Sequence, residues 1–368
     1  MPVKKIDVVL GTRPEAIKMS PVVLELRHRE NFKVRVIATG QHTDMLAQAL
    51  AYFSLEADVN LGIMKSRQSL DYVTSSVLLG VGDVFDADVP DAVLVHGDTT
   101  TTFAASLAAF YRRIPLGHVE AGLRSFDMGR PFPEEMNRVM TDRIATWWFA
   151  PTELAKSNLL REGAAGERIY VTGNTVVDAL RAAAERARKP SGPLASLGGA
   201  PFLLLTAHRR ESWGTPLESI CKALLAILEL HPDFRAIVPM HRNPAVRDVM
   251  TDILGEDGRI ILCEPLDYPD FVWAMDNCSL ILSDSGGVQE EATSLRKPAL
   301  VLRDVTERPE AVENGSCILV GTDGERIIAA AESLLSDPEA REKLLERCRE
   351  NPFGDGLASV RIADALYV

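Results

Sequence analysis

Three acidic residues have the side chains and the positions for proton transfer at one site. Asp98 and Glu120 each follow an apolar run of the kind that forms a buried strand, and Glu134 begins a helical stretch. Grouped carboxylates in a partly buried site can supply a general acid and a general base near neutral pH. A structural role is also open: Asp98 could cap a helix, and Glu134 with Glu135 could be acidic charges at a helix N-terminus.

Two cations near a predicted helix start indicate an anion site. The segment GTRPEAIK, residues 11–18, joins a predicted strand to a helix, and Thr12 with Glu15 fits a capping box. This leaves Arg13 and Lys18 unexplained, because the helix macrodipole favours negative charge at that end. A bound phosphate or carboxylate would offset their cost, although Lys18 could also be a solvated charge.

A serine and two glycines open another predicted helix. Ser285, Gly286 and Gly287, in the segment DSGGVQEE, can offer a hydroxyl and backbone N–H groups to a diphosphate. Glu291 lies one helical turn further on, where a diphosphate would repel it and ribose hydroxyls would suit it better. Glycines are also common in plain turns, so the motif has a structural alternative.

Two histidines end apolar runs in the second half of the chain. His208 and His241 lie after the predicted strands 202–206 and 236–239, and each is followed by an arginine. His208 could donate to a phosphate or act as an acid, whereas a lone histidine is more often structural. No group of His, Asp and Cys has the spacing of metal ligands, so we expect no metal site.

The elements that would position these residues alternate between strand and helix, which predicts doubly wound parallel sheets with helices on both faces. The apolar runs include 6–10, 33–38, 92–96, 116–119, 147–150, 202–206, 260–263 and 280–283. We expect two Rossmann-like domains, residues 1–175 and 176–351, with a Pro/Gly/Ser-rich linker at 187–201 and a helical tail over 324–349. In such folds ligands bind at the carboxyl ends of the strands, so the expected site is the cleft between the domains.

Composition excludes several classes of protein. Hydrophobic residues make up 46% and charged residues 25% of the 368 residues, which is typical of a globular chain and not of a disordered or fibrous one. A net charge of −12 without a Lys/Arg run argues against nucleic acid as a partner, and no apolar run is long enough to span a membrane. Five cysteines without a CxxC pair, and an N-terminal segment interrupted by Asp7, favour the cytoplasm over a secreted, disulfide-bonded protein.

Taken in order, nine segments carry a family resemblance that runs from about residue 6 to the C-terminus. They are GTRPEAIKMSP, QHTDML, VLVHGDTTTTFAASLAAFY, GHVEAGLR, FPEEMNR, TAHRRES, DSGGVQEE, KPALVLRDVTERPE and NPFGDG. In this combination the chain resembles the non-hydrolysing UDP-N-acetylglucosamine 2-epimerases of bacteria. The resemblance implies a GT-B fold, a C-terminal helix at about 352–368 that packs on the first domain, a homodimer, and no cofactor. It implies interconversion of UDP-N-acetylglucosamine and UDP-N-acetylmannosamine, a precursor of cell-surface polysaccharide.

The resemblance also implies a mechanism, in which UDP is eliminated to give enzyme-bound 2-acetamidoglucal and is then added back with inversion at C2. Asp98 and Glu134 would be the proton-transfer pair, in an order that the sequence leaves open, with Glu120 also in the sugar site and His208 a further catalytic residue. The UDP-binding residues would be Arg13, Lys18, His208, Phe271 (through the backbone near uracil), Ser285, Gly286, Gly287, Glu291 and Arg308.

Many bacterial members of the family bind a second UDP-N-acetylglucosamine as an activator. Gln41, Arg67, Arg209 and His241 match positions of that regulatory site. Two departures leave room for an altered regulatory site or for a sugar modified at C3 or C6. The chain has Gly129-Arg130-Pro131 where many relatives have Tyr-Ser-Pro, and Asp44 where some have a longer polar side chain.

Three other functions fit parts of the pattern. A hydrolysing epimerase would release free N-acetylmannosamine and UDP, which requires water to reach the glucal. A GT-B glycosyltransferase and a non-catalytic nucleotide-sugar sensor would both use the nucleotide-binding half. Neither of these two needs Asp98, Glu120 and Glu134 together, so the joint presence of the three carboxylates favours an epimerase.

Overall fold

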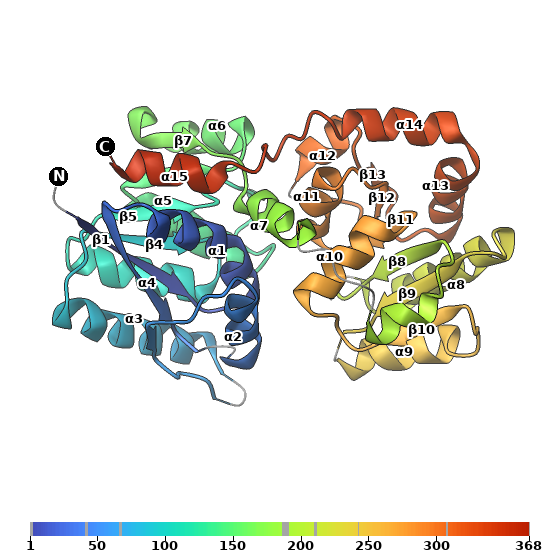
Figure 1. Cartoon of the computed structure of the whole chain (residues 1–368), viewed down its shortest axis with the longest axis horizontal. Helices are drawn as coiled ribbons and strands as arrows, with labels where there is room; N and C mark the ends of the chain where they lie inside the picture. The colour runs from blue at the N-terminus through green and yellow to red at the C-terminus, as the bar shows by residue number, and fades with distance from the viewer. Residues whose placement is uncertain are drawn as a thin grey trace. The chain divides into compact units, whose positions relative to one another are not determined.

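The chain folds into two compact units, Met1–Ala179 with Phe353–Val368, and Leu180–Pro352. The structure is a computed structural model that describes residues 3–40, 43–65, 68–185, 191–209, 212–241, 243–306 and 308–367. Each unit has a parallel sheet covered by helices (Figure 1). The predicted class of two doubly wound α/β units is therefore confirmed.

The first unit contains a seven-stranded parallel sheet in the order β3-β2-β1-β4-β5-β6-β7. Its strands are β1 (Lys4–Leu10), β2 (Phe32–Ala38), β3 (Val59–Asn60), β4 (Ala92–His96), β5 (Leu116–Val119), β6 (Trp147–Ala150) and β7 (Ile169–Val171). The chain changes direction across the sheet between β1 and β4. In a Rossmann-like sheet this switch point leaves a crevice at the carboxyl ends of the two strands, where ligands bind.

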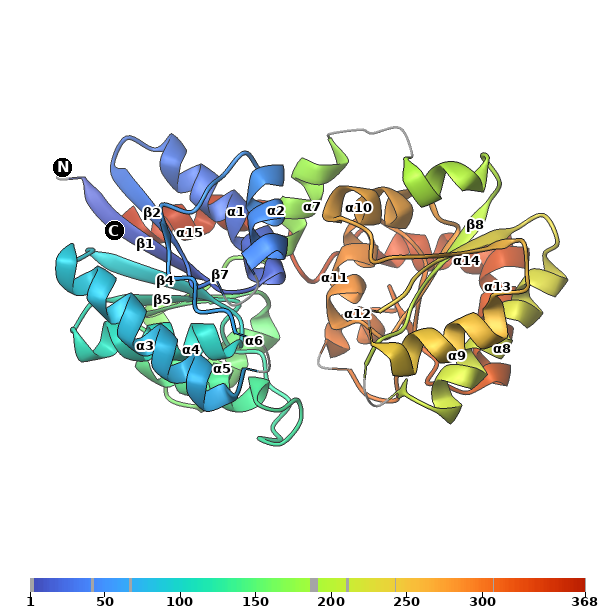
Figure 2. The same ribbon diagram turned by 90° about the horizontal axis from the view of Figure 1, so that it is seen from below.

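Helices cover both faces of this sheet. They are α1 (Arg13–His28), α2 (Thr43–Tyr52), α3 (Leu70–Ala87), α4 (Thr100–Tyr111), α5 (Glu134–Ile144), α6 (Glu153–Arg161) and α15 (Ala358–Tyr367). Helix α7 (Thr175–Ala184) begins in the first unit and ends in the second. Figure 2 shows α3, α4 and α5 on one side and α1 with α15 on the other. The C-terminal helix α15 packs against α1 and is capped by Asp178, which accepts hydrogen bonds from the backbone N–H groups of Ala358 (3.2 Å) and Ser359 (2.8 Å).

The second unit repeats the plan with six strands in the order β10-β9-β8-β11-β12-β13. They are β8 (Phe202–Thr206), β9 (Arg235–Pro239), β10 (Ile260–Cys263), β11 (Leu280–Ser283), β12 (Ala299–Val301) and β13 (Ile318–Leu319). The helices are α8 (Thr215–Leu230), α9 (Pro244–Leu254), α10 (Tyr268–Asn277), α11 (Gly286–Ser294), α12 (Pro309–Glu313), α13 (Gly324–Ser336) and α14 (Pro338–Arg347). The switch point lies between β8 and β11.

The helical tail expected over 324–349 is not one helix. It divides into α13 and α14 at Asp337, whose carboxylate accepts a hydrogen bond from the N–H of Glu339 at 2.9 Å. Pro338 explains the break, because a proline has no N–H to continue the helix and disfavours helical backbone in the preceding residue. Among the described residues, no helix combines the length and the hydropathy that a membrane-spanning segment requires.

Candidate active site

A buried carboxylate joins the two loops at the switch point of the first unit. Glu15 accepts hydrogen bonds from the N–H groups of Gly11 (2.7 Å) and Thr12 (2.6 Å) and from the hydroxyls of Thr99 (2.5 Å) and Thr102 (3.0 Å). These bonds hold the loop that follows β1 against the loop that follows β4. Glu15 thus takes part in the predicted capping of α1 and also joins the two loops.

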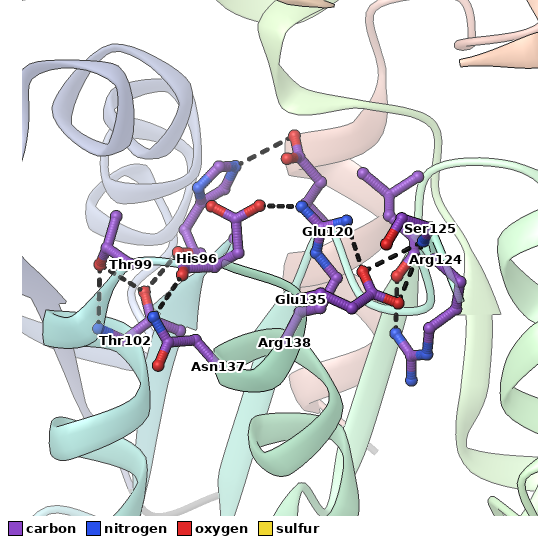
Figure 3. Close-up of polar contacts among 12 residues, drawn as sticks. His96, Thr99, Thr102, Glu120, Arg124, Ser125, Glu135, Asn137 and Arg138 are labelled. Atoms are coloured by element: carbon purple, nitrogen blue, oxygen red, sulfur yellow. Dashed lines mark hydrogen bonds and ion pairs between the residues drawn. The ribbon is translucent and has the colours of Figure 1, made fainter. Parts of the chain in front are cut away.

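Asp98 lies in the second of these loops, and its predicted alternative as a helix cap is wrong. Thr99 is the N-cap of α4, and its side chain accepts the N–H of Thr102 at 3.1 Å (Figure 3). The Asp98 carboxylate instead contacts the guanidinium of Arg138, while its carbonyl accepts a bond from Asn137 Nδ2 at 2.9 Å. The Asp98 side chain is 29% exposed, so solvent or a ligand can reach part of it.

Glu120 has a strained backbone and a crowded carboxylate. Its φ of 68° is in the left-handed region, which costs a non-glycine residue on the order of 1 kcal/mol and often occurs at functional sites. Its Oε2 contacts Lys18 Nζ and accepts a bond from Asn174 Nδ2 at 2.9 Å. The same oxygen lies 3.4 Å from His96 Nε2 (Figure 3). Lys18 is buried, so its alternative as a solvated charge is wrong.

The two adjacent acids at the start of α5 have different surroundings. Glu135 is buried and accepts hydrogen bonds from the N–H groups of Ser125 and Phe126, both at 3.0 Å, so it fixes the loop before α5. Glu134 Oε2 is also buried, but it makes no hydrogen bond to any residue that the structure describes. Glu135 therefore has a structural role, whereas the Oε2 of Glu134 is left without a described hydrogen-bond donor.

Beneath the two loops lies a buried ionic network that the sequence analysis missed. His118 Nδ1 is 2.6 Å from Asp142 Oδ1, and its Nε2 is 2.8 Å from the carbonyl oxygen of Gly97. Asp142 Oδ2 accepts bonds from Gly122 N (3.1 Å) and from Arg124 Nη2 (2.8 Å). Burial alone would raise the pKa of Asp142, but His118 and Arg124 outweigh it and hold that pKa below its usual value. The network ties α5 to the loops on either side of Asp98 and Glu120.

A buried aspartate plays the matching role at the switch point of the second unit. Asp284 Oδ2 accepts hydrogen bonds from the N–H groups of His208 and Arg209, both at 2.9 Å, and from Ser212 Oγ at 3.2 Å. Its Oδ1 lies 3.4 Å from Nδ1 of the His208 ring. Asp284 thus holds the loop after β8 against the loop after β11 and orients His208, a residue that the sequence analysis proposed without its partner.

The predicted diphosphate motif opens α11 next to an arginine. Ser285 is the N-cap, and Gly286 and Gly287 are the first helical residues. A Cβ atom at Gly286 would lie 2.5 Å from Nη1 of Arg308, whereas no other described atom would lie within 4 Å of one at Gly287. Arg308 is anchored by Glu290, whose Oε1 accepts from its Nε at 2.6 Å. The structure thus places Ser285, Gly286 and Arg308 together.

Among the residues proposed for regulation, His241 stacks on His208. Their ring centroids are 6.0 Å apart with an interplanar angle of 17°. Arg209 Nη2 would lie 3.6 Å from a Cβ at Gly286, so Arg209 also borders the start of α11. Gln41 and Arg67 lie outside the described residues.

Comparison with known proteins decides the family. The sequence model of the UDP-N-acetylglucosamine 2-epimerase family matches residues 24–367. A UDP-N-acetylglucosamine 2-epimerase from Neisseria meningitidis is 46% identical over 98% of this chain and 99% of its own length, and one from Escherichia coli K12 is 48% identical over 98% of each. The chain belongs to the UDP-N-acetylglucosamine 2-epimerase family.

Solved structures of epimerases have the same fold. The crystal structure of the Neisseria meningitidis UDP-GlcNAc 2-epimerase, bound to UDP-GlcNAc, superposes with a TM-score of 0.91 and covers 99% of both chains. An epimerase from Methanocaldococcus jannaschii, in complex with UDP-GlcNAc and UDP, is 38% identical with a TM-score of 0.85 and again covers 99% of both. These matches, with the two parallel sheets, confirm the predicted GT-B fold.

In this epimerase chain the candidate residues form separate groups. In the first unit, Asp98 is held from α5, while Glu120 contacts Lys18 and Asn174. Arg13 is the first residue of α1, beside the loop held by Glu15. Of the remaining UDP candidates, Glu291 is buried within α11 and Phe271 is half-buried in α10.

Proposed function

We propose that the chain interconverts UDP-N-acetylglucosamine and UDP-N-acetylmannosamine reversibly, by elimination and re-addition of UDP without hydrolysis. The observation that supports this most strongly is the pair of carboxylates near the first switch point. Asp98 is half-buried and ion-paired, and Glu134 has a buried oxygen without a hydrogen bond to any described residue. Two carboxylates in unlike environments suit a reaction that removes one proton and delivers another.

The elimination starts at C2 of the sugar. One carboxylate takes the C2 proton, the electron pair of the C2–H bond forms the C1=C2 double bond, and the C1–O bond breaks with its electrons on the β-phosphate oxygen of UDP. The products are 2-acetamidoglucal, UDP and a protonated carboxylic acid. In the second half, the other carboxyl group gives a proton to the opposite face of C2 while the same UDP oxygen bonds again to C1. Asp98 and Glu134 supply the two proton transfers, with Glu120 in the sugar site.

The second unit holds the leaving group. N–H groups at the start of α11, with Arg308 beside Gly286, favour a diphosphate because they combine backbone donors at a helix N-terminus with a fixed cation. His208, oriented by Asp284, can donate to the departing phosphate oxygen. Arg13 and Lys18 of the first unit and Glu291 and Phe271 of the second complete the proposed binding residues, and the reaction requires that water be kept from the glucal.

The assembly and the regulation of the enzyme are also proposals. A homodimer is supported by large apolar side chains that α3 and α4 leave exposed, namely Leu79, Phe110 and Tyr111. Free, buried cysteines suit a reducing compartment such as the cytoplasm. The stacked rings of His208 and His241, next to Arg209, support a second UDP-sugar site beside the catalytic one.

Product analysis tests the proposal directly. The purified chain is incubated with UDP-N-acetylglucosamine, and in a second reaction with UDP-N-acetylmannosamine, and the products are separated by ion-pair chromatography. We expect both reactions to reach the same mixture of the two UDP-sugars with only traces of free UDP. Free N-acetylmannosamine with an equal amount of UDP would instead establish the hydrolysing reaction, and no change would indicate a UDP-sugar modified at C3 or C6.

A further inference from the structure

We propose that Arg138 is a positioning residue that holds the Asp98 carboxylate in place as the proton acceptor of the reaction. This inference rests on the proposed function, because it gives Asp98 a catalytic task. Arg138 was not among the residues that the sequence pointed to. It lies one turn into α5, and its guanidinium reaches across to the loop after β4 (Figure 3).

The guanidinium of Arg138 joins one anchored acid to one accessible acid. Its Nη1 lies 3.1 Å from Oε2 of Glu135, and its Nη2 contacts Oδ2 of Asp98. The Arg138 side chain is 7% exposed and that of Glu135 is 1% exposed, against 29% for Asp98. Glu135 is itself fixed by the backbone of Ser125 and Phe126. Arg138 is therefore held from behind and presents its other nitrogen to the carboxylate that a ligand can reach.

A second contact from the same helix fixes the backbone of Asp98. Asn137, the residue before Arg138, donates its Nδ2 hydrogen bond to the carbonyl of Asp98 at 2.9 Å. Two consecutive residues of α5 thus hold both the main chain and the side chain of one loop residue. Reacting groups must stay within a fraction of an ångström of their productive positions, so such double support is expected around a group that takes part in chemistry.

The surroundings of Glu134 differ from those of Asp98, and this difference indicates which of the two removes the C2 proton and which supplies the new one. Glu134 belongs to the same turn of α5, yet its buried Oε2 has no hydrogen-bond partner among the described residues. The guanidinium of Arg138 orients the Asp98 carboxylate as a hydrogen-bond acceptor toward the ligand, whereas no described donor occupies the Oε2 of Glu134. Starting from the gluco sugar, Asp98 removes the C2 proton and Glu134 supplies the new one.

The test replaces Arg138 in the full-length protein and separates positioning from folding. We expect Arg138→Ala to lower kcat at least about 100-fold, as for a misplaced catalytic group, with less than about a 3-fold change in KM and in the affinity for UDP. Added ethylguanidinium should restore part of the lost kcat, because it can occupy the vacated space between Glu135 and Asp98. Arg138→Lys should retain more activity than Arg138→Ala.

A matched control lies on the same helix. Arg143 is exposed and donates only to the carbonyl of Glu162 at 2.6 Å among the described contacts, so Arg143→Ala should keep the wild-type kcat. An unchanged kcat in Arg138→Ala would overturn the inference. So would a loss of kcat that accompanies a lower melting temperature and is not restored by ethylguanidinium. If the wild type itself produces no UDP-N-acetylmannosamine, the proposed function fails first, and the inference falls with it.

Discussion

Within this site, the same chemical group behaves differently according to its neighbours. Glu134 and Glu135 are adjacent in the sequence, but Glu135 binds two backbone N–H groups and Arg138, while Glu134 keeps a buried oxygen without a described hydrogen bond. Glu15 and Asp284 are likewise buried acids, and each binds the N–H groups of a loop at a switch point. Burial of a carboxylate is tolerated where such donors surround it. The acids that organise the site are thus distinct from the acids that we propose to react in it.

At the same scale, Asp142 predicts a dependence of stability on pH. Its folded pKa is lowered, so its ionised form adds stability above the unfolded pKa of about 3.9, and that stability is lost as the pH falls through the lower folded pKa. We expect Asp142→Asn to cost about 3–5 kcal/mol at pH 7, because Arg124 and His118 lose their buried partner. The difference from the wild type should shrink below about pH 4.

Urea unfolding between pH 7 and pH 3 measures this effect. Asp86→Asn is the control, because Asp86 also forms an ion pair, with Arg112 at 2.5 Å, but on the surface. Its effect should be much smaller. A cost for Asp142→Asn that does not change with pH would contradict the assigned charge of Asp142.

At the scale of elements, the start of α11 offers a substitution that separates ligand binding from folding. Gly287 lies in the first turn, it has open space where a Cβ would be placed, and its φ is not in the left-handed region. Gly287→Ala should therefore raise the free energy of unfolding by up to about 1 kcal/mol, because alanine is the better helix former. If the backbone there approaches a diphosphate, the added methyl group should weaken UDP binding by about 10-fold or more, or roughly 1.4 kcal/mol.

Calorimetric titration with UDP and thermal unfolding of the free protein provide the two readouts. Gly286→Ala is the comparison, because its Cβ would lie 2.5 Å from Nη1 of Arg308 and would displace that guanidinium, which should weaken UDP binding. Unchanged UDP affinity in Gly287→Ala would show that the ligand does not lie against this turn.

Strands and helices could be predicted from the sequence where their buried residues form a regular apolar pattern. The strands β4, β5, β6, β8, β10 and β11 match their predicted bounds, because strands buried in a parallel sheet are continuous apolar runs. The helix α3 carried a signal that was missed, since its buried residues Val73, Val77, Val81 and Phe85 recur every four positions. The split between α13 and α14 was also readable from Asp337-Pro338.

The site could be predicted only in part, and for a physical reason. Residues that follow strands, such as Asp98 and His208, share a position that the fold itself singles out. Their partners lie on other elements: Arg138 is 40 residues from Asp98, and Asp284 is 76 residues from the backbone of His208. The sequence around a buried charge does not indicate which distant residue pairs with it, because only tertiary packing brings the two together.

At the scale of the whole molecule, the reactivity of the cysteines measures the opening of the second unit only. Cys221, Cys263, Cys278, Cys317 and Cys348 are all buried, and all belong to the second unit. Burial raises the pKa of Cys221, Cys278 and Cys317 to about 12 and that of Cys263 and Cys348 to about 11. Iodoacetamide reacts with thiolates, so at pH 8 the native thiols should react very slowly, and their alkylation should follow the opening of the second unit.

Ligand binding should slow this alkylation. UDP at 100 times its dissociation constant stabilises the unit that binds it by about 2.7 kcal/mol, which corresponds to a roughly 100-fold slower reaction when opening is limiting. Mass spectrometry counts the modified cysteines, and adenosine diphosphate controls for charge alone. Equal rates with and without UDP would contradict the placement of the nucleotide in the second unit.

The proposed reaction exchanges the C2 proton of the sugar and keeps the UDP. Proton NMR of the purified chain with UDP-N-acetylglucosamine in D2O measures both at once, and Asp98→Asn is the paired variant. We predict UDP-N-acetylmannosamine with deuterium at C2, very little free UDP, and loss of exchange in Asp98→Asn while UDP still binds. A product that retains its original C2 hydrogen, release of UDP in equal amount with free sugar, or full exchange in Asp98→Asn would contradict the account.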